Sequence, residues 1–167
     1  MPGVRGVSKT SSLIRFYTIA LLILLLDQAT KFAAITFLTE TGSVPVLQGI
    51  FHLTLVHNTG VAFGLFREHG AILLGMITLS VVLLSLWAHY ILRAGVLMET
   101  SLALILGGAV GNWIDRLRLG SVVDFLDFRI WPVFNVADTA ISIGVALYCF
   151  LLLKGMRTGG SDETGSP

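Results

Sequence analysis

Three aspartates stand close together in an otherwise apolar chain, and their type and spacing are the first hint of chemistry. Asp124 and Asp127 lie in VVDFLDF, and Asp138 follows in FNVAD beside another apolar run. Ionised groups beside hydrocarbon are costly and therefore mark functional candidates. Two carboxylates that share a site keep one proton between them, so the pair can activate water as a base and protonate a leaving amine as an acid. This is the chemistry of aspartic proteases.

The pair that we expect to meet is Asp124 and Asp138. Asp124 is predicted in an outer loop after Gly120 and Ser121, and Asp138 one turn into an apolar helix. Both would then lie near one membrane interface, although spacing alone does not show that they meet. Asp127 is interpreted as a solvated loop carboxylate.

Two further polar sets enter the apolar blocks. Asp27 and Lys31 are four residues apart, which places them on one helix face where they can pair; the pair either fixes helix packing or serves a site. Asn112, Asp115 and Arg116 converge on one face at spacings of three and four residues. Packing does not need three such groups, whereas a site that holds a peptide carbonyl or a phosphate-like headgroup would use them.

A metal centre and a serine nucleophile are both disfavoured. His52, His57 and His69 lie in one outer segment and His89 toward the opposite side, with neither helical i, i+4 spacing nor an HExxH run. Ser121 has no GxSxG context and is interpreted as a turn residue.

The elements that must position these residues are membrane helices. The chain has 167 residues, of which 54% are hydrophobic and 13% charged, and its mean hydropathy is +0.85. Soluble domains carry about 25% charged residues. The apolar residues also fall in long blocks rather than amphipathic stripes, which indicates a bilayer environment. The net charge of +1 gives no indication of a nucleic-acid partner.

Four apolar blocks predict four transmembrane helices, each near the roughly 20 residues that a span needs. The blocks cover about residues 15–38, 71–92, 96–114 and 134–153. The first is interpreted as an uncleaved helix, because apolar residues resume after DQATK. In the third, Gly107 and Gly111 have the spacing that lets a neighbouring helix approach closely.

Basic residues set the expected orientation. The first fifteen residues hold three basic residues and no acid, which predicts a cytoplasmic N-terminus, and four spans return the C-terminus to the same side. We therefore expect a cytoplasmic segment at 1–14, one four-helix domain at 15–154 and a disordered cytoplasmic tail at 155–167. An outer segment at about 42–66 predicts one or two strands on the membrane surface, turning at Asn58-Thr59-Gly60.

The chain resembles the bacterial lipoprotein signal peptidases (signal peptidase II, an aspartyl intramembrane peptidase family) in five motifs that occur in the family's order. They are DQATK at 27–31, NTGVAF at 58–63, GGAVGNWIDR at 107–116, GSVVDF at 120–125 and FNVAD at 134–138. One departure is Val61, where the family more often has alanine.

The resemblance implies a role for each matched residue. Asp124 and Asp138 correspond to the two catalytic aspartates, and Asp27 and Lys31 to a first-helix pair that supports the site. The polar residues expected to line the site and position substrate are Asn58, Asn112, Arg116 and Asn135. Gly60 and Gly108 belong to the same motifs and are counted among the supporting residues.

The resemblance also implies a fold and an activity. Members are all-α membrane proteins with four transmembrane helices, a small extracytoplasmic β-cradle and a periplasmic helix. They cut signal peptides from diacylglyceryl-modified prolipoproteins just before the lipidated cysteine. We accordingly expect a monomeric enzyme of the bacterial cytoplasmic (inner) membrane, with its active site facing the outer side, membrane lipid and prolipoprotein as partners, and no metal or other cofactor.

Two other functions fit the sequence less well. A small proton-coupled transporter or channel would use Asp27, Lys31, Asp115 and Asp138 as a relay. It would place polar residues at several depths and show symmetry between halves, whereas most of these residues gather toward one side and no internal repeat is seen. A non-catalytic scaffold would have little use for asparagine, arginine and two aspartates on one face.

Overall fold

The computed structural model describes residues 9–60, 70–91 and 95–159, and within these it contains four helices and a three-stranded sheet. The helices are α1 (Lys9–Leu38), α2 (Gly70–Ile91), α3 (Val96–Leu119) and α4 (Val136–Gly159). The strands are β1 (Ser43–Leu47), β2 (Phe51–Asn58) and β3 (Val122–Asp127). Val61, His69 and the side chain of His89 lie outside the described part of the chain.

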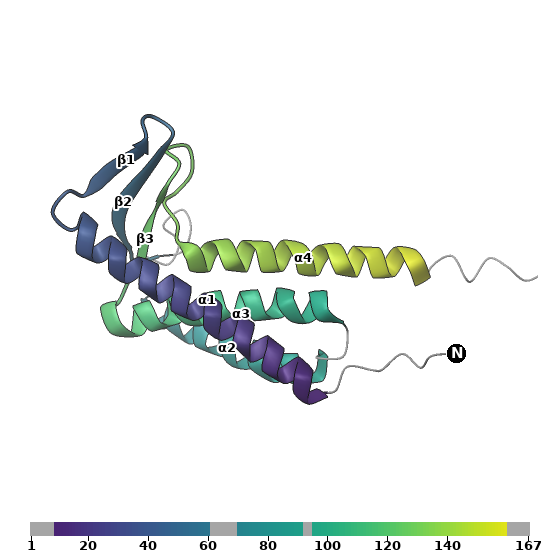
Figure 1. The fold of residues 1–167 in the computed structure, drawn as a ribbon. Coiled ribbons are helices and arrows are strands. Elements are labelled where there is room, and N and C mark those ends of the chain that lie inside the picture. The colour runs from purple at the N-terminus through teal and green to yellow at the C-terminus, as the bar shows by residue number, and fades with distance from the viewer. Residues whose placement is uncertain (1–8, 61–69, 92–94, 160–167) are drawn as a thin grey trace, which may run out of the picture.

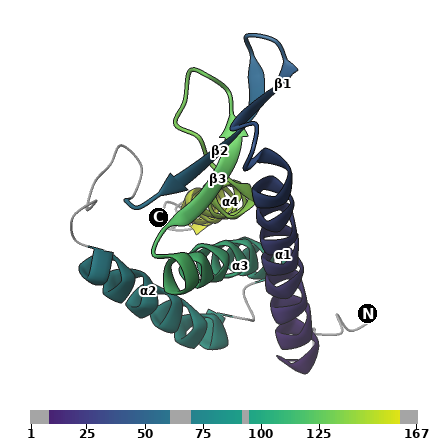
Figure 2. The ribbon, with the colours of Figure 1, turned by 90° about the vertical axis from the view of Figure 1, so that its left-hand side faces the viewer.

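The sheet lies at one end of the helices, while α1 begins and α4 ends at the other end (Figure 1). Turned by 90°, the molecule shows α3 between α1 and α2 (Figure 2), and α3 packs against all three other helices. Helices α1, α3 and α4 are long and apolar enough to cross a membrane, and α2 is apolar over Leu74–Trp87. Large apolar side chains such as Phe32 and Phe150 are exposed on the helices, as expected where hydrocarbon is the solvent.

Glycines allow α3 to lie against its neighbours. A Cβ atom at Gly107 would lie 2.5 Å from the Ala20 carbonyl oxygen of α1, and one at Gly111 would meet the Asp27 carboxylate. Both glycines therefore face α1, which confirms the predicted close approach of a neighbouring helix. Gly108 faces α4 instead, where a Cβ would lie 2.5 Å from the Ala137 carbonyl oxygen.

An ion pair joins α1 and α3 at the end away from the sheet. Arg15 Nε donates to Glu99 Oε2 at 3.0 Å, and its Nη2 also bonds to Glu99 and to Ser12 Oγ. Glu99 is 2% exposed. Beside it, Phe16, Ala20, Leu102, Ala103 and Leu106 form the main buried apolar cluster.

Helix α2 is held to the bundle by side chains. Trp113 Nε1 of α3 donates to Thr78 Oγ1 at 2.8 Å. Farther along the helix, the Trp87 ring lies edge-on to Tyr148 of α4, with centroids 5.9 Å apart. Val81 and Leu84 of α2 also pack against the main buried apolar cluster, so the helix is attached to the bundle by side-chain packing as well as by these two contacts.

The outer segment forms strands, as predicted, but the hairpin turn between them lies earlier than expected. β1 and β2 pair antiparallel around residues 48–50, where Gly49 has φ +76°. β2 then ends at Asn58, where the sequence predicted a turn, and the Asn58 Oδ1 atom accepts the Gly60 N–H. The loop predicted around Asp124 is wrong, because residues 122–127 form β3, which pairs antiparallel with β2.

Helix α3 continues five residues past its predicted end, to Leu119. Gly120 then stops it in the left-handed conformation, with φ 70° and its N–H bonded to the Arg116 carbonyl oxygen. A glycine in this position is a common helix terminator because it has no Cβ to strain. The extra turn brings Arg116 to the edge of the sheet.

Candidate active site

Asp138 is fixed by the first turn of α4. Asn135 precedes the helix, and its Oδ1 accepts the Asp138 N–H at 2.8 Å, while Asp138 Oδ2 accepts the Asn135 N–H at 3.3 Å. Reciprocal bonds of this kind form a capping box, which satisfies N–H groups that a helix start leaves free. The local sequence NVAD therefore both starts the helix and fixes the orientation of the Asp138 carboxyl group.

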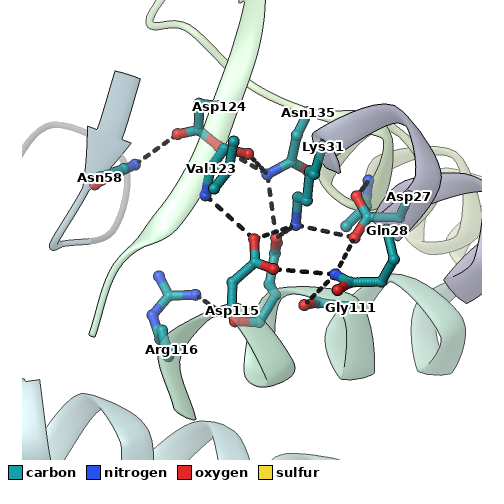
Figure 3. A network of polar contacts seen from close by, with 12 residues as sticks. Asp27, Gln28, Lys31, Asn58, Gly111, Asp115, Arg116, Val123, Asp124 and Asn135 are labelled. Carbon is teal, nitrogen blue, oxygen red and sulfur yellow. Dashed lines mark hydrogen bonds and ion pairs between the residues drawn. The ribbon is translucent and has the colours of Figure 1, made fainter. Parts of the chain in front are cut away.

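Asn135 also reaches Asp124 (Figure 3). Its Nδ2 donates to Asp124 Oδ1 at 2.7 Å, and its main-chain N–H bonds to Asp138, so that one fully buried residue joins β3 to the start of α4 and contacts both carboxyl groups. The same nitrogen contacts the Val123 carbonyl at 3.3 Å and Asn112 Oδ1 at 3.1 Å. The structure thus brings Asp124 and Asp138 to one place through a shared neighbour.

The second oxygen of Asp124 faces the end of β2. Asn58 Nδ2 donates to Asp124 Oδ2 at 3.0 Å, and Asn58 Oδ1 accepts the Gly60 N–H at 3.0 Å. Arg116 Nη2 donates to the Gly60 carbonyl at 2.9 Å. Gly60 therefore contributes main-chain groups that tie the end of β2 to α3.

Asn112 completes the contacts of Asp138. Its Nδ2 donates to Asp138 Oδ1 at 2.8 Å, and its Oδ1 accepts from Lys31 Nζ at 2.8 Å. Lys31 thereby fixes which end of the Asn112 amide faces the aspartate. Of the remaining matched residues, Gly108 lies directly against the Ala137 carbonyl, and its lack of a side chain allows α3 and α4 to pack closely.

The pKa of Asp124 is raised to about 6. Burial is the largest cause, because it penalises the charged form; the Asn58 hydrogen bond opposes it, the Asp138 charge adds to it, and the Asn135 hydrogen bond opposes it again. The Asp124 side chain is well shielded, with the residue 2% exposed, whereas Asp138 is only half-buried. Asp124 is consequently a carboxyl group that can hold a proton close to neutral pH.

A cavity of about 690 Å³ opens beside the two aspartates. One part of its wall is polar and consists of Asn58, Asn112, Arg116, Asp124 and Asp138. The rest is largely apolar and comes from α2, α3, α4 and the segment after β3; it includes Ile77, Ala109, Trp131, Val133, Phe134 and Ile141. An apolar chamber with a few convergent polar groups is the usual form of a ligand site.

Asp127 is not the solvated loop carboxylate that the sequence suggested. It lies on β3 and is 5% exposed, because Thr54 Oγ1 donates to it at 2.8 Å and Arg129 donates from its N–H at 2.8 Å and from Nη1 at 3.1 Å. Desolvation acts to raise its pKa, but the hydrogen bonds and the Arg129 charge outweigh it and lower the pKa below the ordinary value. It is not among the residues that line the cavity.

Asp27 and Lys31 form the ion pair that their spacing allows, with Nζ 2.9 Å from Asp27 Oδ2. Lys31 also pairs with Asp115 Oδ2 at 2.8 Å. Sequence reasoning missed Gln28, whose Nε2 donates to Asp115 Oδ1 at 3.0 Å and to Asp27 Oδ2 at 3.2 Å (Figure 3). A signal was present, since Gln28 is a polar residue inside an apolar block and lies one helical turn from Lys31.

Comparison with known proteins identifies what this arrangement resembles. The family model described as signal peptidase (SPase) II matches residues 19–154. The lipoprotein signal peptidase of Moorella thermoacetica is 48% identical over 83% of this chain and 92% of its own length, and that of Halothermothrix orenii is 41% identical over 86% and 98%. A bacterial membrane enzyme solved by the in meso method at 2.3 Å resolution superposes with a TM-score of 0.78 and 29% identity, covering 95% of both chains.

Proposed function

The chain belongs to the signal peptidase II family, and we propose that it works as an aspartic endopeptidase on diacylglyceryl-modified prolipoproteins, cutting just before the lipidated cysteine. The function common to the family, removal of signal peptides from lipoproteins, is that of this enzyme, and a transporter or channel is not supported. The observation that carries the aspartic mechanism is geometric. Asp124 and Asp138 share a neighbour, Asn135, at one wall of a cavity.

In the proposed reaction, water lies between the two carboxyl groups. Ionised Asp138 takes a proton from this water as the oxygen attacks the scissile carbonyl carbon, and protonated Asp124 gives its proton to the carbonyl oxygen. When the tetrahedral diol collapses, the C–N bond breaks, Asp138 passes its proton to the leaving amine, and a diol hydroxyl returns one to Asp124. The products are the carboxyl end of the signal peptide and the free amine of the lipidated cysteine.

The pKa of Asp124, raised to about 6, supports this division of roles, because the more buried carboxyl is the one that holds the proton. The polar wall supports substrate binding. An extended peptide near hydrocarbon leaves amide groups unsatisfied, each at a cost of several kcal/mol. Asn58, Asn112 and Arg116 offer groups that offset this cost, while the apolar wall accepts the acyl chains and the signal helix.

The enzyme sits in the bacterial cytoplasmic membrane with its sheet and cavity on the outer side. α1 begins and α4 ends at the far side of the bundle, and the acid-free basic N-terminus supports a cytoplasmic location for that side. In this arrangement residues 1–14 and 155–167 are cytoplasmic and 15–154 form the peptidase domain. We propose that the enzyme works as a monomer surrounded by membrane lipid.

The catalytic proposal is tested with purified enzyme and a diacylglyceryl-modified prolipoprotein in micelles. We expect Asp124→Asn and Asp138→Asn to lower the cleavage rate on the order of 10³-fold, since asparagine keeps the shape and removes the proton transfer. Asp127→Asn is the matched control, because it changes a buried carboxylate on the same strand outside the cavity. Near-normal cleavage by either of the first two variants would show that the residue is not catalytic.

The orientation is tested by labelling intact cells with a membrane-impermeant maleimide. Ile130→Cys, in a Cys149→Ser background, places a thiol at a position that is 93% exposed next to the sheet. We expect it to react in spheroplasts, whereas Lys9→Cys at the start of α1 should react only after permeabilisation. The reverse pattern would overturn the proposed orientation.

A further inference from the structure

We propose that Asp27, Lys31 and Asp115 form a positioning bridge that sets the separation of Asp124 and Asp138. The inference rests on the proposed function, since it assigns these three residues a part in the same reaction. They are positioning residues, because they act on the aspartates through the main chain.

The two outer members of the bridge make equivalent contacts. Asp115 Oδ2 accepts the N–H of Val123 at 3.2 Å, and Val123 directly precedes Asp124. Asp27 Oδ1 accepts the N–H of Ala137 at 2.9 Å, and Ala137 directly precedes Asp138. Each carboxylate thus holds the main chain one residue before a catalytic aspartate, once on β3 and once at the start of α4.

Lys31 joins the two halves of the bridge. Its ammonium lies 2.9 Å from Asp27 Oδ2 and 2.8 Å from Asp115 Oδ2, and it donates to Asn112 Oδ1 at 2.8 Å. An ammonium has three N–H donors, and these three acceptors match that number. The third contact leaves the Asn112 Nδ2 group facing Asp138.

Burial and packing make the bridge stiff. Asp27 is 0% exposed, Lys31 2% and Asp115 3%, so water does not compete for their hydrogen bonds. Gln28 Nε2 donates to both carboxylates, and a Cβ at Gly111 would collide with Asp27. α1, α3, β3 and α4 are therefore held together at this one point (Figure 3).

The Arg15–Glu99 pair shows how a packing role differs. It joins the same two helices, α1 and α3, and also buries its carboxylate. Its hydrogen bonds reach Ser12 on α1, at the end of the bundle away from the sheet. It can stabilise the helix pair, but it is too far along the helices to set the spacing of the two aspartates.

Proton transfer depends on the separation of the groups that exchange protons. A misplacement of about 1 Å can lower a rate about 10²-fold. Loss of the bridge should therefore lower kcat while KM changes little, because Asn58 and Arg116 still line the cavity. A merely structural role predicts instead a lower melting temperature with a normal kcat for the folded fraction.

The test measures kcat, KM, the pH profile and the melting temperature of Asp115→Asn and Asp115→Glu. Asp115→Asn removes the negative charge that pairs with Lys31. Asp115→Glu keeps that negative charge but moves it by one methylene. We expect both to lower kcat about 10²-fold with KM within about threefold, and to displace the pH limits of kcat/KM. Glu99→Gln is the matched control and should keep kcat within about threefold at a similar loss of melting temperature.

Full kcat in folded Asp115→Asn or Asp115→Glu overturns the bridge. If neither variant folds, Gln28→Leu decides, since it removes a neutral contact to Asp115 and leaves all charges in place. We expect a five- to tenfold loss of kcat there, on the order of one weakened neutral hydrogen bond, and an unchanged kcat counts against the proposal. Failure of the proposed function looks different, because Asp124→Asn or Asp138→Asn would then still cleave.

Discussion

Strand β3 carries two buried aspartates, and their surroundings differ in kind. Asp127 receives a hydroxyl from Thr54 and a guanidinium from Arg129, so its negative charge has a positive partner. Within the described part of the chain, the hydrogen-bond partners of the Asp124 carboxyl group are the neutral amides of Asn58 and Asn135. The two residues are three positions apart on one strand. The Asp127 carboxylate has a positively charged partner, whereas the described hydrogen-bond donors to Asp124 are neutral.

The pKa values follow this difference in opposite directions. The pKa of Asp127 is lowered below the ordinary value, mainly because hydrogen bonds from Arg129 and Thr54 outweigh its desolvation. The pKa of Asp124 is raised to about 6, because burial outweighs the bonds from its amide partners and the Asp138 charge is nearby. Low exposure alone therefore does not raise the pKa of a carboxyl group; the pKa rises where desolvation outweighs the hydrogen bonds and charges that favour the anion.

The largest contrast is expected from removing one hydrogen-bond donor at each aspartate. Asn135→Ala deletes the amide that bonds to Asp124 and caps α4, so we expect a loss of cleavage rate on the order of 10²-fold and of about 1 kcal/mol of stability. Thr54→Val deletes the donor to Asp127 and should keep the rate within about twofold. Equal losses in both variants, measured as kcat and unfolding temperature, would remove the distinction between the two aspartates.

The pH dependence of kcat/KM sharpens the comparison. If Asp124 must carry a proton, kcat/KM declines as pH rises through about 6, where Asp124 ionises. Asp127→Asn should leave this limb unchanged, because its pKa lies below the ordinary range. A profile that is flat from about pH 5 to about pH 8, a range that includes the limb near 6, would show that Asp124 is not the acid.

Asn58→Ala is expected to move that limb. Asn58 donates to Asp124 and so favours the charged form, which lowers the pKa. Without this donor the pKa of Asp124 rises, and the decline in kcat/KM shifts to higher pH. Thr54→Val is the control at Asp127, where the limb should stay in place; a shift to lower pH in Asn58→Ala would contradict the assignment.

The smallest effect concerns stability at Asp127. Its folded pKa is lowered, so the group contributes stability above its unfolded pKa of about 3.9 and loses it as pH falls through the folded value. Asp127→Asn should lower the unfolding free energy at pH 7 by less than about 1 kcal/mol, and the difference should vanish near pH 2. Thermal unfolding in detergent at the two pH values measures it; a difference that grows in acid would reverse the sign.

Sequence reasoning located the helices and proposed most of the polar residues that gather at the cavity. Hydropathy marks spans because a bilayer requires long apolar runs, and the Asp27–Lys31 pair follows from helical spacing alone. Strand β3 was not predicted because its partner residues on β2 are 64 to 75 positions away in the sequence, and their register depends on the tertiary structure. The bond between Asp27 and the Ala137 N–H spans 110 residues and involves a main-chain donor that every residue type except proline carries. Such a contact cannot be predicted from a pattern of side chains.

Helix α3 meets α1 and α4 through Gly107 and Gly108, where main chains lie almost in contact. Glycine has no side chain that could change rotamer, so these contacts cannot adjust in that way when the lateral pressure or thickness of the bilayer changes. Such changes are more easily absorbed at α2, which is attached through side chains, among them the Trp113–Thr78 and Trp87–Tyr148 contacts and the packing of Val81 and Leu84. The part of the enzyme that carries the two aspartates should then keep its shape in different lipids, while α2, which contributes Ile77 and Ser80 to the cavity wall, should move more easily.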